Sequence, residues 1–285
     1  MSKILYRTLG SEFIKKIITD LQKASTKLGV DFFGVGALAR NVWYVSNQEP
    51  SRGTKDIDFG VYVPNSEIYN HLREMLIKEF SYKEVSDNPF RLMSPYGIAL
   101  DLLPFGEIEN NGKVMIEGKG LIEISLDGFM EAYINGLITM EIEDSEIKIC
   151  SIPSVVLLKL IAYDDRPEYR QSDPKDINSI INHYPKLEKE MIWEKYSFLY
   201  HDGWSHEEVG IKVLGYELSR IIVDNEKLIL RVLEILNKAL SLSSKLAESM
   251  IDNAVTETVE SKIKNLKILK DGIKEGLETA INNDH

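Results

Sequence analysis

Two aspartates, Asp56 and Asp58, stand one residue apart in a stretch where hydrophobic and polar residues alternate. Ile57, Phe59 and Val61 supply the hydrophobic positions, which is the pattern of a β-strand with one buried face. Side chains two residues apart point to the same side of a strand, so we expect the two carboxylates side by side. Neighbouring carboxylates repel, and a hard divalent cation such as Mg²⁺, which also binds phosphate, relieves that repulsion. The spacing predicts a metal–phosphate site; the alternative is a solvated strand face.

A third aspartate, Asp101, is the only charged residue of the apolar stretch 98–104. A buried carboxylate is costly without a partner, so we expect Asp101 to have one. It could cap a turn at the end of a strand, or it could join Asp56 and Asp58 from a neighbouring strand.

A glycine-containing turn, Gly34-Val35-Gly36, connects a predicted strand to a predicted helix at 37–44. Backbone N–H groups at such a turn and at a helix N-terminus can bind phosphate. Glycine permits close approach and backbone conformations that other residues avoid. The alternative is a tight turn in front of a packed helix.

The hydrophobic pattern divides the chain into two parts, residues 1–150 and residues 151–285. The first part mixes short strands with helices, of which the first has Ser11 as its expected N-cap and Gly29 as its expected stop. The second part is mainly helical. Helices are predicted at 11–28, 66–79, 127–135, 155–163, 206–222, 224–240 and 243–281, with another beginning near Pro174.

Lys159 is the only cation of the predicted apolar helix 155–163. A buried lysine requires an anion, whereas a lysine near the helix surface can extend its ammonium to solvent. Lys175 and Asp176 follow at the start of the next predicted helix.

Composition limits the class of protein. The net charge of −11 argues against an extended surface for duplex nucleic acid, which requires clustered lysine and arginine. The single cysteine, Cys150, excludes an intramolecular disulfide and is typical of a reducing compartment; it falls in a predicted strand. No stretch resembles a signal peptide or has the apolar length of a membrane span. We therefore expect a cytoplasmic protein.

Taken in order, these residues resemble the nucleotidyltransferase superfamily with the polymerase-β-like core, and most of all the AbiEii/AbiGii-type toxin nucleotidyltransferases. The resemblance covers roughly residues 25–185 and not the rest of the chain. In the superfamily the turn usually reads Gly-Ser or Gly-Gly; here Val35 separates the glycines, so only backbone N–H groups remain for phosphate. The matching set runs Gly34-Val35-Gly36-Ala37, Arg52-Gly53-Thr54-Lys55-Asp56-Ile57-Asp58, Asp101, Lys159 and Lys175-Asp176.

The resemblance implies an α+β fold: a mixed, mostly antiparallel sheet with helices on one face, followed by a mainly helical C-terminal domain. It also implies an enzyme that uses Mg²⁺ to transfer a nucleoside monophosphate (NMP) from a nucleoside triphosphate (NTP) to an acceptor. The acceptor could be an RNA 3′ end, a protein or a small molecule. By the same resemblance the enzyme would be a toxin of a toxin–antitoxin or phage-defence pair, with an antitoxin protein as partner.

The same resemblance implies roles for individual residues. Asp56, Asp58 and Asp101 would hold one or two Mg²⁺ ions, and Asp101 could also serve as the base. The nucleotide-binding residues would be Gly34 and Gly36, which cradle phosphates, Arg52, Thr54 and Lys159, which contact phosphate, and Asp176, which orients Lys159 or binds ribose. Two alternatives remain open: a non-catalytic nucleotide-binding or interaction protein on this fold, and an unrelated α+β protein with a solvated acidic strand.

Overall fold

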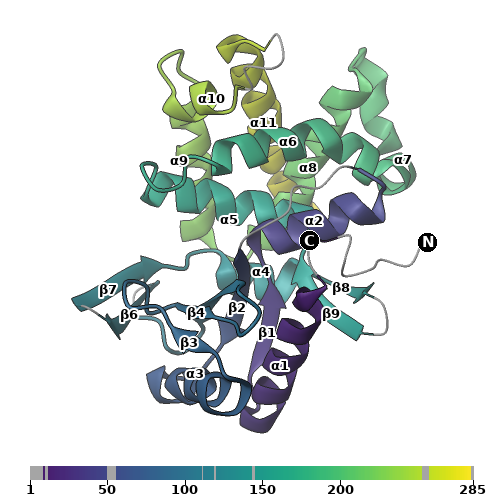
Figure 1. Ribbon diagram of the computed structural model, residues 1–285. Coiled ribbons are helices and arrows are strands. Elements are labelled where there is room, and N and C mark those ends of the chain that lie inside the picture. The colour runs from purple at the N-terminus through teal and green to yellow at the C-terminus, as the bar shows by residue number, and fades with distance from the viewer. Residues whose placement is uncertain are drawn as a thin grey trace. The chain divides into compact units, whose positions relative to one another are not determined.

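The computed structural model describes residues 9, 12–49, 56–110, 112–118, 120–142, 145–251 and 257–283. The chain divides into two compact units. The first comprises Met1–Tyr133 and Leu137–Ser151, and the second comprises Ile134–Gly136 and Ile152–His285. Every strand of the described residues belongs to the first unit, and the second is helical (Figure 1). The predicted α+β class, with a mainly helical C-terminal part, is confirmed.

A seven-stranded sheet is the centre of the first unit. Its strands are β1 (Asp31–Gly34), β2 (Asp56–Tyr62), β3 (Lys83–Glu84), β4 (Arg91–Met93), β5 (Ala99–Phe105), β8 (Leu137–Ile142) and β9 (Ser145–Cys150). They are ordered β3-β4-β5-β2-β1-β9-β8. Four of the six neighbouring pairs are antiparallel, and β2–β5 and β1–β9 are parallel. The sheet is therefore mixed and mostly antiparallel, as predicted. A separate antiparallel hairpin consists of β6 (Lys113–Gly118) and β7 (Gly120–Ser125).

The helices of the first unit begin and end at recognisable signals. They are α1 (Phe13–Leu28), α2 (Gly36–Ser46), α3 (Ser66–Phe80) and α4 (Phe129–Asn135). Gly29 ends α1 in the left-handed conformation, as its sequence predicts, with φ of 65°. Asn65 caps α3 by accepting a hydrogen bond from the backbone N–H of Ile68 at 3.0 Å. The expected N-cap of α1, Ser11, lies outside the described residues.

Helices pack on both faces of the sheet, and not on one face as the resemblance implied. Phe32 packs edge-on against Phe59 on the face that α1 covers, with 5.4 Å between ring centroids. The next residue, Phe33, points to the opposite face and contacts Phe129 of α4 at 6.3 Å. Gly60 makes room for both rings, because a Cβ there would lie 2.8 Å from Phe33. The small residue in β2 therefore admits α4 to the second face.

The second unit is an assembly of helices. They are α5 (Ile152–Asp165), α6 (Asp173–Leu187), α7 (Lys189–Tyr196), a 3₁₀ helix (Ser197–Asp202), α8 (His206–Ile222), α9 (Glu226–Ala239), α10 (Lys245–Ser249) and α11 (Val259–Asn283). The single helix expected at 243–281 is thus two helices, α10 and α11. Gly215 of α8 and Gly272 of α11 let these helices approach until a Cβ on either would meet the backbone of the other. No described helix has the length and hydrophobicity needed to cross a bilayer.

Glu188, between α6 and α7, is an unusual carboxyl group in the second unit. Its pKa is raised to about 7, first because it is buried and second because Glu217 of α8 is nearby, while Lys195 opposes the shift. Glu217 accepts a hydrogen bond from the hydroxyl of Tyr196 at 2.6 Å and so remains close to Glu188.

We expect the free energy of unfolding to decrease as pH rises from about 5 to 7.5. The pKa of Glu188 is higher in the folded chain than in the unfolded chain, so protonation of Glu188 stabilises the fold. This stabilisation is complete at pH values below the pKa of the unfolded chain. It is lost as the pH rises through the pKa of the folded chain, near 7. The loss should be roughly 1–3 kcal/mol, measured by urea unfolding across this range. Glu188→Gln should flatten the dependence, and Glu190→Gln, at an exposed neighbour, should not. Identical pH profiles for both variants would contradict the assignment.

Candidate active site

The register of the sheet brings the three predicted aspartates together. Asp58 of β2 and Asp101 of β5 are direct partners on adjacent parallel strands. Asp56 lies two residues before Asp58 and points to the same face, while Ile57 and Phe59 are 1% and 0% exposed on the other. One oxygen from each of the three carboxylates lies within 4.8 Å of the others. The alternation of β2 therefore separates a buried apolar face from an acidic one.

The donor set of this acidic triad, Asp56, Asp58 and Asp101, suits a hard metal ion. A metal ion needs several His, Cys, Asp or Glu side chains close together. Among the residues that the structure describes, the three aspartates of the triad are close enough to share one. Three carboxylates provide only oxygen ligands, which Mg²⁺ and similar ions prefer over softer metals. The residues present therefore fit the ion that the resemblance implied.

Arg91 of β4 supplies a cation to the triad, and it lies outside the residues that the sequence predicted for the site. It is the antiparallel register partner of Asp101. Nε and Nη2 of Arg91 donate to the two oxygens of Asp101, each at 2.6 Å, and Nη2 also donates to Oδ2 of Asp56 at 3.1 Å. These interactions, above all the hydrogen bonds to Asp101, hold the pKa of Arg91 above its ordinary value. The sequence contained one signal, an arginine between Phe90 and Leu92, but its partner depended on the register.

The glycine turn meets the triad at Asp58. Gly36, the first residue of α2, has φ of 56°, and a Cβ there would lie 2.7 Å from Oδ2 of Asp58. The N–H of Val35 donates to the backbone oxygen of Asp58 at 3.0 Å, and no side chain caps α2. The N-terminus of a helix carries a partial positive charge and unpaired N–H groups, which favour a nearby carboxylate or phosphate. Two features therefore favour glycine at position 36: the nearby carboxylate of Asp58 and the positive φ of the backbone.

Gly34 has a different environment. It is buried, and a Cβ there would lie 3.0 Å from Leu38 and 3.1 Å from Ile149. Its small size leaves room beside β1 for the side chains of Leu38 from α2 and Ile149 from β9. Among the remaining predicted nucleotide-binding residues, Arg52 and Thr54 lie outside the described part of the chain.

Lys159 and Asp176 lie in the second unit and contact each other. The Lys159 ammonium is 2.6 Å from Oδ1 of Asp173 and 2.9 Å from Oδ2 of Asp176. All three residues are buried, and Lys159 is 9% exposed, so its ammonium meets two carboxylates and does not extend to solvent. Asp173 lies outside the residues that the sequence predicted for the site, and its Oδ2 is buried without a hydrogen-bond partner among the described residues.

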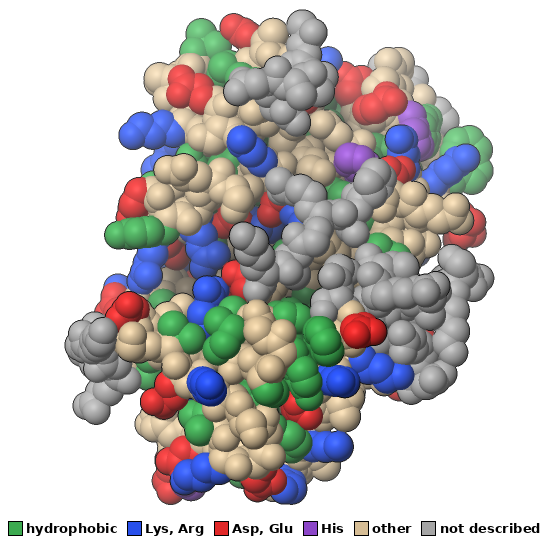
Figure 2. Space-filling view, in the orientation of Figure 1, with side chains coloured by type: hydrophobic (Ala, Val, Ile, Leu, Met, Phe, Trp, Pro, Cys, Tyr) green, Lys and Arg blue, Asp and Glu red, His purple; other side chains and the backbone are tan. Residues whose placement is uncertain are grey.

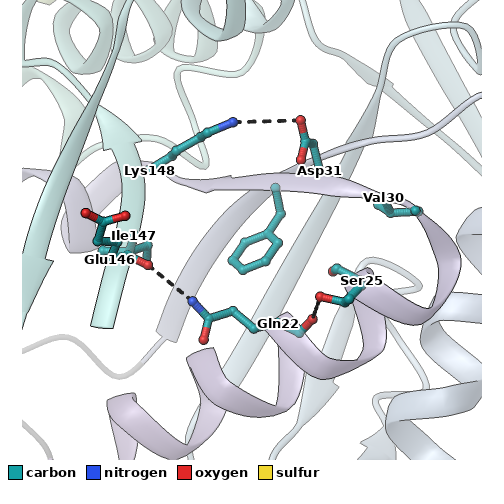
Figure 3. A pocket seen from close by; sticks show the side chains of 10 residues that line it. Gln22, Ser25, Val30, Asp31, Glu146, Ile147 and Lys148 are labelled. Atoms are coloured by element: carbon teal, nitrogen blue, oxygen red, sulfur yellow. Dashed lines mark hydrogen bonds and ion pairs between the residues drawn. The ribbon is translucent and has the colours of Figure 1, made fainter. Parts of the chain in front are cut away.

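A separate cavity of about 410 Å³ lies between α1, β1 and β9 (Figure 3). Lys148 approaches Asp31 within 3.8 Å on one side, and the Gln22 amide donates to the backbone oxygen of Glu146 at 3.2 Å on the other. Asp31 pairs with Tyr62, the last residue of β2, and Asp58 lies four residues earlier, which separates the cavity from the nearest aspartate of the triad by about 13 Å of strand. The cavity shares no lining residue with the acidic triad.

Comparison with known proteins yields weak similarities. No family model matches the sequence, and no curated protein matches it significantly. One solved structure, an antigenic nucleotidyltransferase-like protein from Paracoccidioides brasiliensis, is 16% identical; the match covers 70% of this chain and 93% of that one, with a TM-score of 0.38. The antibiotic-resistance factor ANT(2'')-Ia is 13% identical over 66% and 95% of the two chains, with a TM-score of 0.35. Neither similarity, at these values, establishes an activity.

Replacement of Gly36 by alanine should destabilise the chain more than replacement of Gly29. Both glycines have left-handed backbone conformations, so each alanine should cost about 1–2 kcal/mol of strain. A Cβ at Gly36 also meets Asp58, whereas one at Gly29 meets nothing within 4 Å. Urea unfolding should therefore show a further loss of about 1 kcal/mol or more for Gly36→Ala. Equal losses would mean that the Gly36–Asp58 contact is not tight.

Lys159→Met should destabilise the second unit by about 3–5 kcal/mol, because it removes the buried cation that both Asp173 and Asp176 contact. Lys238→Met is the matched control: Lys238 is exposed and pairs with Glu234 one helical turn away. Its loss should remain below about 1 kcal/mol. Chemical denaturation of both variants measures the difference, and a Lys159 variant as stable as the control would contradict the ion-pair assignment.

Proposed function

We propose that this chain is a metal-dependent nucleotidyltransferase that moves an NMP from an NTP to an acceptor. The observation that supports this proposal is the acidic triad beside the N-terminus of α2. Carboxylates for a metal ion and backbone N–H groups for phosphate lie next to each other at Asp58 and Gly36. Phosphoryl chemistry needs these two elements together, because the substrate carries both phosphate oxygens and their metal ions.

The reaction would join an acceptor hydroxyl oxygen to the α-phosphorus, break the bond from that phosphorus to pyrophosphate, and release the hydroxyl proton. Bound Mg²⁺ would neutralise the charge on the triphosphate and on the departing pyrophosphate. Asp56, Asp58 and Asp101 would hold one or two such ions. Asp101 is also the proposed base, with one constraint: each of its oxygens already accepts a hydrogen bond from Arg91.

The remaining nucleotide contacts are part of the same proposal. Gly36 and the N–H groups that follow it would bind phosphate, with Gly34 keeping the turn in place. Arg52 and Thr54 would contact the triphosphate. Lys159, whose ammonium meets Asp173 and Asp176, would contact phosphate, as the resemblance implies. Asp176 would then orient Lys159, which we prefer over contact with ribose because the two side chains are in contact.

The acceptor and the biological role are the finer part of the proposal. The net charge of −11 fits a protein or a cationic small molecule better than a large RNA, since like charges repel. The resemblance to AbiEii-type enzymes supports a toxin of a toxin–antitoxin or phage-defence pair, which would have an antitoxin as its protein partner. The acceptor assay below includes all three classes of acceptor.

Incubation of the chain with each α-labelled NTP, Mg²⁺, and total cell RNA, total protein or small amines should transfer label to one acceptor class. Asp58→Asn should abolish this transfer, because it removes a charged ligand from the centre of the triad. Glu74→Gln, which removes an exposed carboxylate from α3, should transfer label at the wild-type rate. Transfer by Asp58→Asn at the wild-type rate would overturn the assignment of the triad.

A thermal-shift measurement on the same samples separates binding from transfer. NTP with Mg²⁺ at a hundredfold excess over its dissociation constant should stabilise the wild-type chain by about 2.7 kcal/mol. Stabilisation without transfer would instead favour the non-catalytic nucleotide-binding protein. The absence of both would favour the solvated acidic strand.

A further inference from the structure

We propose that Arg91 is a resident cation of the acidic triad that disfavours binding of a free divalent ion and favours an ion that arrives bound to nucleotide. This inference rests on the proposed nucleotidyltransferase function and adds a positioning residue and an order of binding to it. Arg91 lies outside the set of residues that the resemblance assigned.

The contacts of Arg91 show how closely it is tied to the triad. Its guanidinium contacts both oxygens of Asp101 and one oxygen of Asp56, so it touches two of the three candidate metal ligands. The three carboxylates and the Arg91 guanidinium together carry a formal charge of −2. The side chains of Arg91 and Asp101 are only 30% and 13% exposed, so solvent screens their interaction less than at an open surface.

The two contacts of Arg91 differ in how easily they can be given up. The contact with Asp101 is a bidentate fork with two short bonds, and the antiparallel register places the residues opposite each other. The contact with Asp56 is one longer bond of 3.1 Å to a carboxylate that is 42% exposed. Each oxygen of a carboxylate has a second lone pair, so Asp101 can ligate an ion while keeping the fork. Binding of an ion therefore affects the Arg91–Asp56 bond first.

The charge of the incoming ion decides whether it can replace Arg91 as the partner of Asp56. A free divalent cation and a guanidinium bound to the same carboxylates repel each other, and even in water such a repulsion at contact distances is worth more than about a tenfold change in affinity. A metal–NTP complex carries a net negative charge, because the triphosphate outweighs one divalent ion. Arg91 should attract this complex. The same residue thus lowers the affinity for the free ion and raises it for the nucleotide-bound ion.

Binding of Mn²⁺, measured by electron paramagnetic resonance, tests this inference. Arg91→Gln keeps hydrogen-bond donors and removes the charge; we expect it to bind free Mn²⁺ about tenfold more tightly than the wild-type chain. Arg91→Lys loses the bidentate fork but keeps the charge on which the repulsion depends, so its affinity for free Mn²⁺ should stay within about threefold of the wild type. Lys148→Met is the matched control. It removes a positive charge from β9 of the same sheet, next to Asp31 at the end of β1 that lies away from the triad. Its affinity for free Mn²⁺ should equal that of the wild type.

The same titrations are repeated with an equimolar mixture of the four NTPs present. Arg91→Gln should then bind the Mn²⁺–NTP complex about tenfold more weakly than the wild type, so that the order of affinities reverses between the two conditions. Far-UV circular dichroism checks the fold, and Arg91→Met serves as a second neutral variant if Arg91→Gln does not fold.

Two outcomes would overturn the inference. The first is that neutral Arg91 variants bind free Mn²⁺ no more tightly than Lys148→Met does. The second is that these variants bind both free Mn²⁺ and Mn²⁺–NTP more weakly than the wild type, which would give Arg91 only the role of orienting Asp101. Neither outcome affects the proposed function, which depends on NTP stabilisation and label transfer by the wild-type chain. Conversely, a wild-type chain that neither binds Mn²⁺–NTP nor transfers label would refute the proposed function, whatever the Arg91 variants do with the free ion.

Discussion

Three carboxylates that converge within 4.8 Å in one sheet repel one another, and the first unit is arranged around this repulsion. Arg91 offsets part of it from one side, and the N-terminus of α2 reaches Asp58 from another. Such an arrangement costs folding energy, because the aspartates would be more favourably solvated apart. A fold that keeps three charges together in spite of this cost is typical of a site that binds a charged ligand.

The geometry around Asp58 shows how the backbone prepares the site. Gly36 has a positive φ, and a Cβ there would lie 2.7 Å from Oδ2 of Asp58; the N–H of Val35 donates to the backbone oxygen of the same aspartate. The turn, the helix and the strand are therefore coupled at one residue. The Val35–Asp58 hydrogen bond joins two backbone groups, so it holds the N–H groups of α2 in a fixed relation to the triad, the pre-organisation that the proposed phosphate binding would require.

Both units contain a cation between two carboxylates, but the two arrangements differ in burial. Arg91 bridges Asp101 and Asp56 where its side chain is 30% exposed, so its longer bond can be exchanged for a ligand. Lys159 bridges Asp173 and Asp176 in the interior of the second unit, where removing a member of a charge cluster is costly. Exposure therefore separates a cation that can respond to a ligand from one that mainly holds α5 and α6 together.

The sequence by itself determined the local elements and the identity of the acidic residues. Alternation placed Asp56 and Asp58 on one face of β2, Gly29 predicted the end of α1, and the lone charge in 98–104 indicated that Asp101 needs a partner. These features depend on residues close in the chain. The partners of Asp101 and Lys159 were decided by the tertiary structure, because strand register brings Arg91 opposite Asp101 and helix packing brings Asp173 to Lys159. The helix on the second face of the sheet has the same origin: Gly60 admits Phe33 and Phe129, a contact between residues distant in sequence that periodicity does not encode.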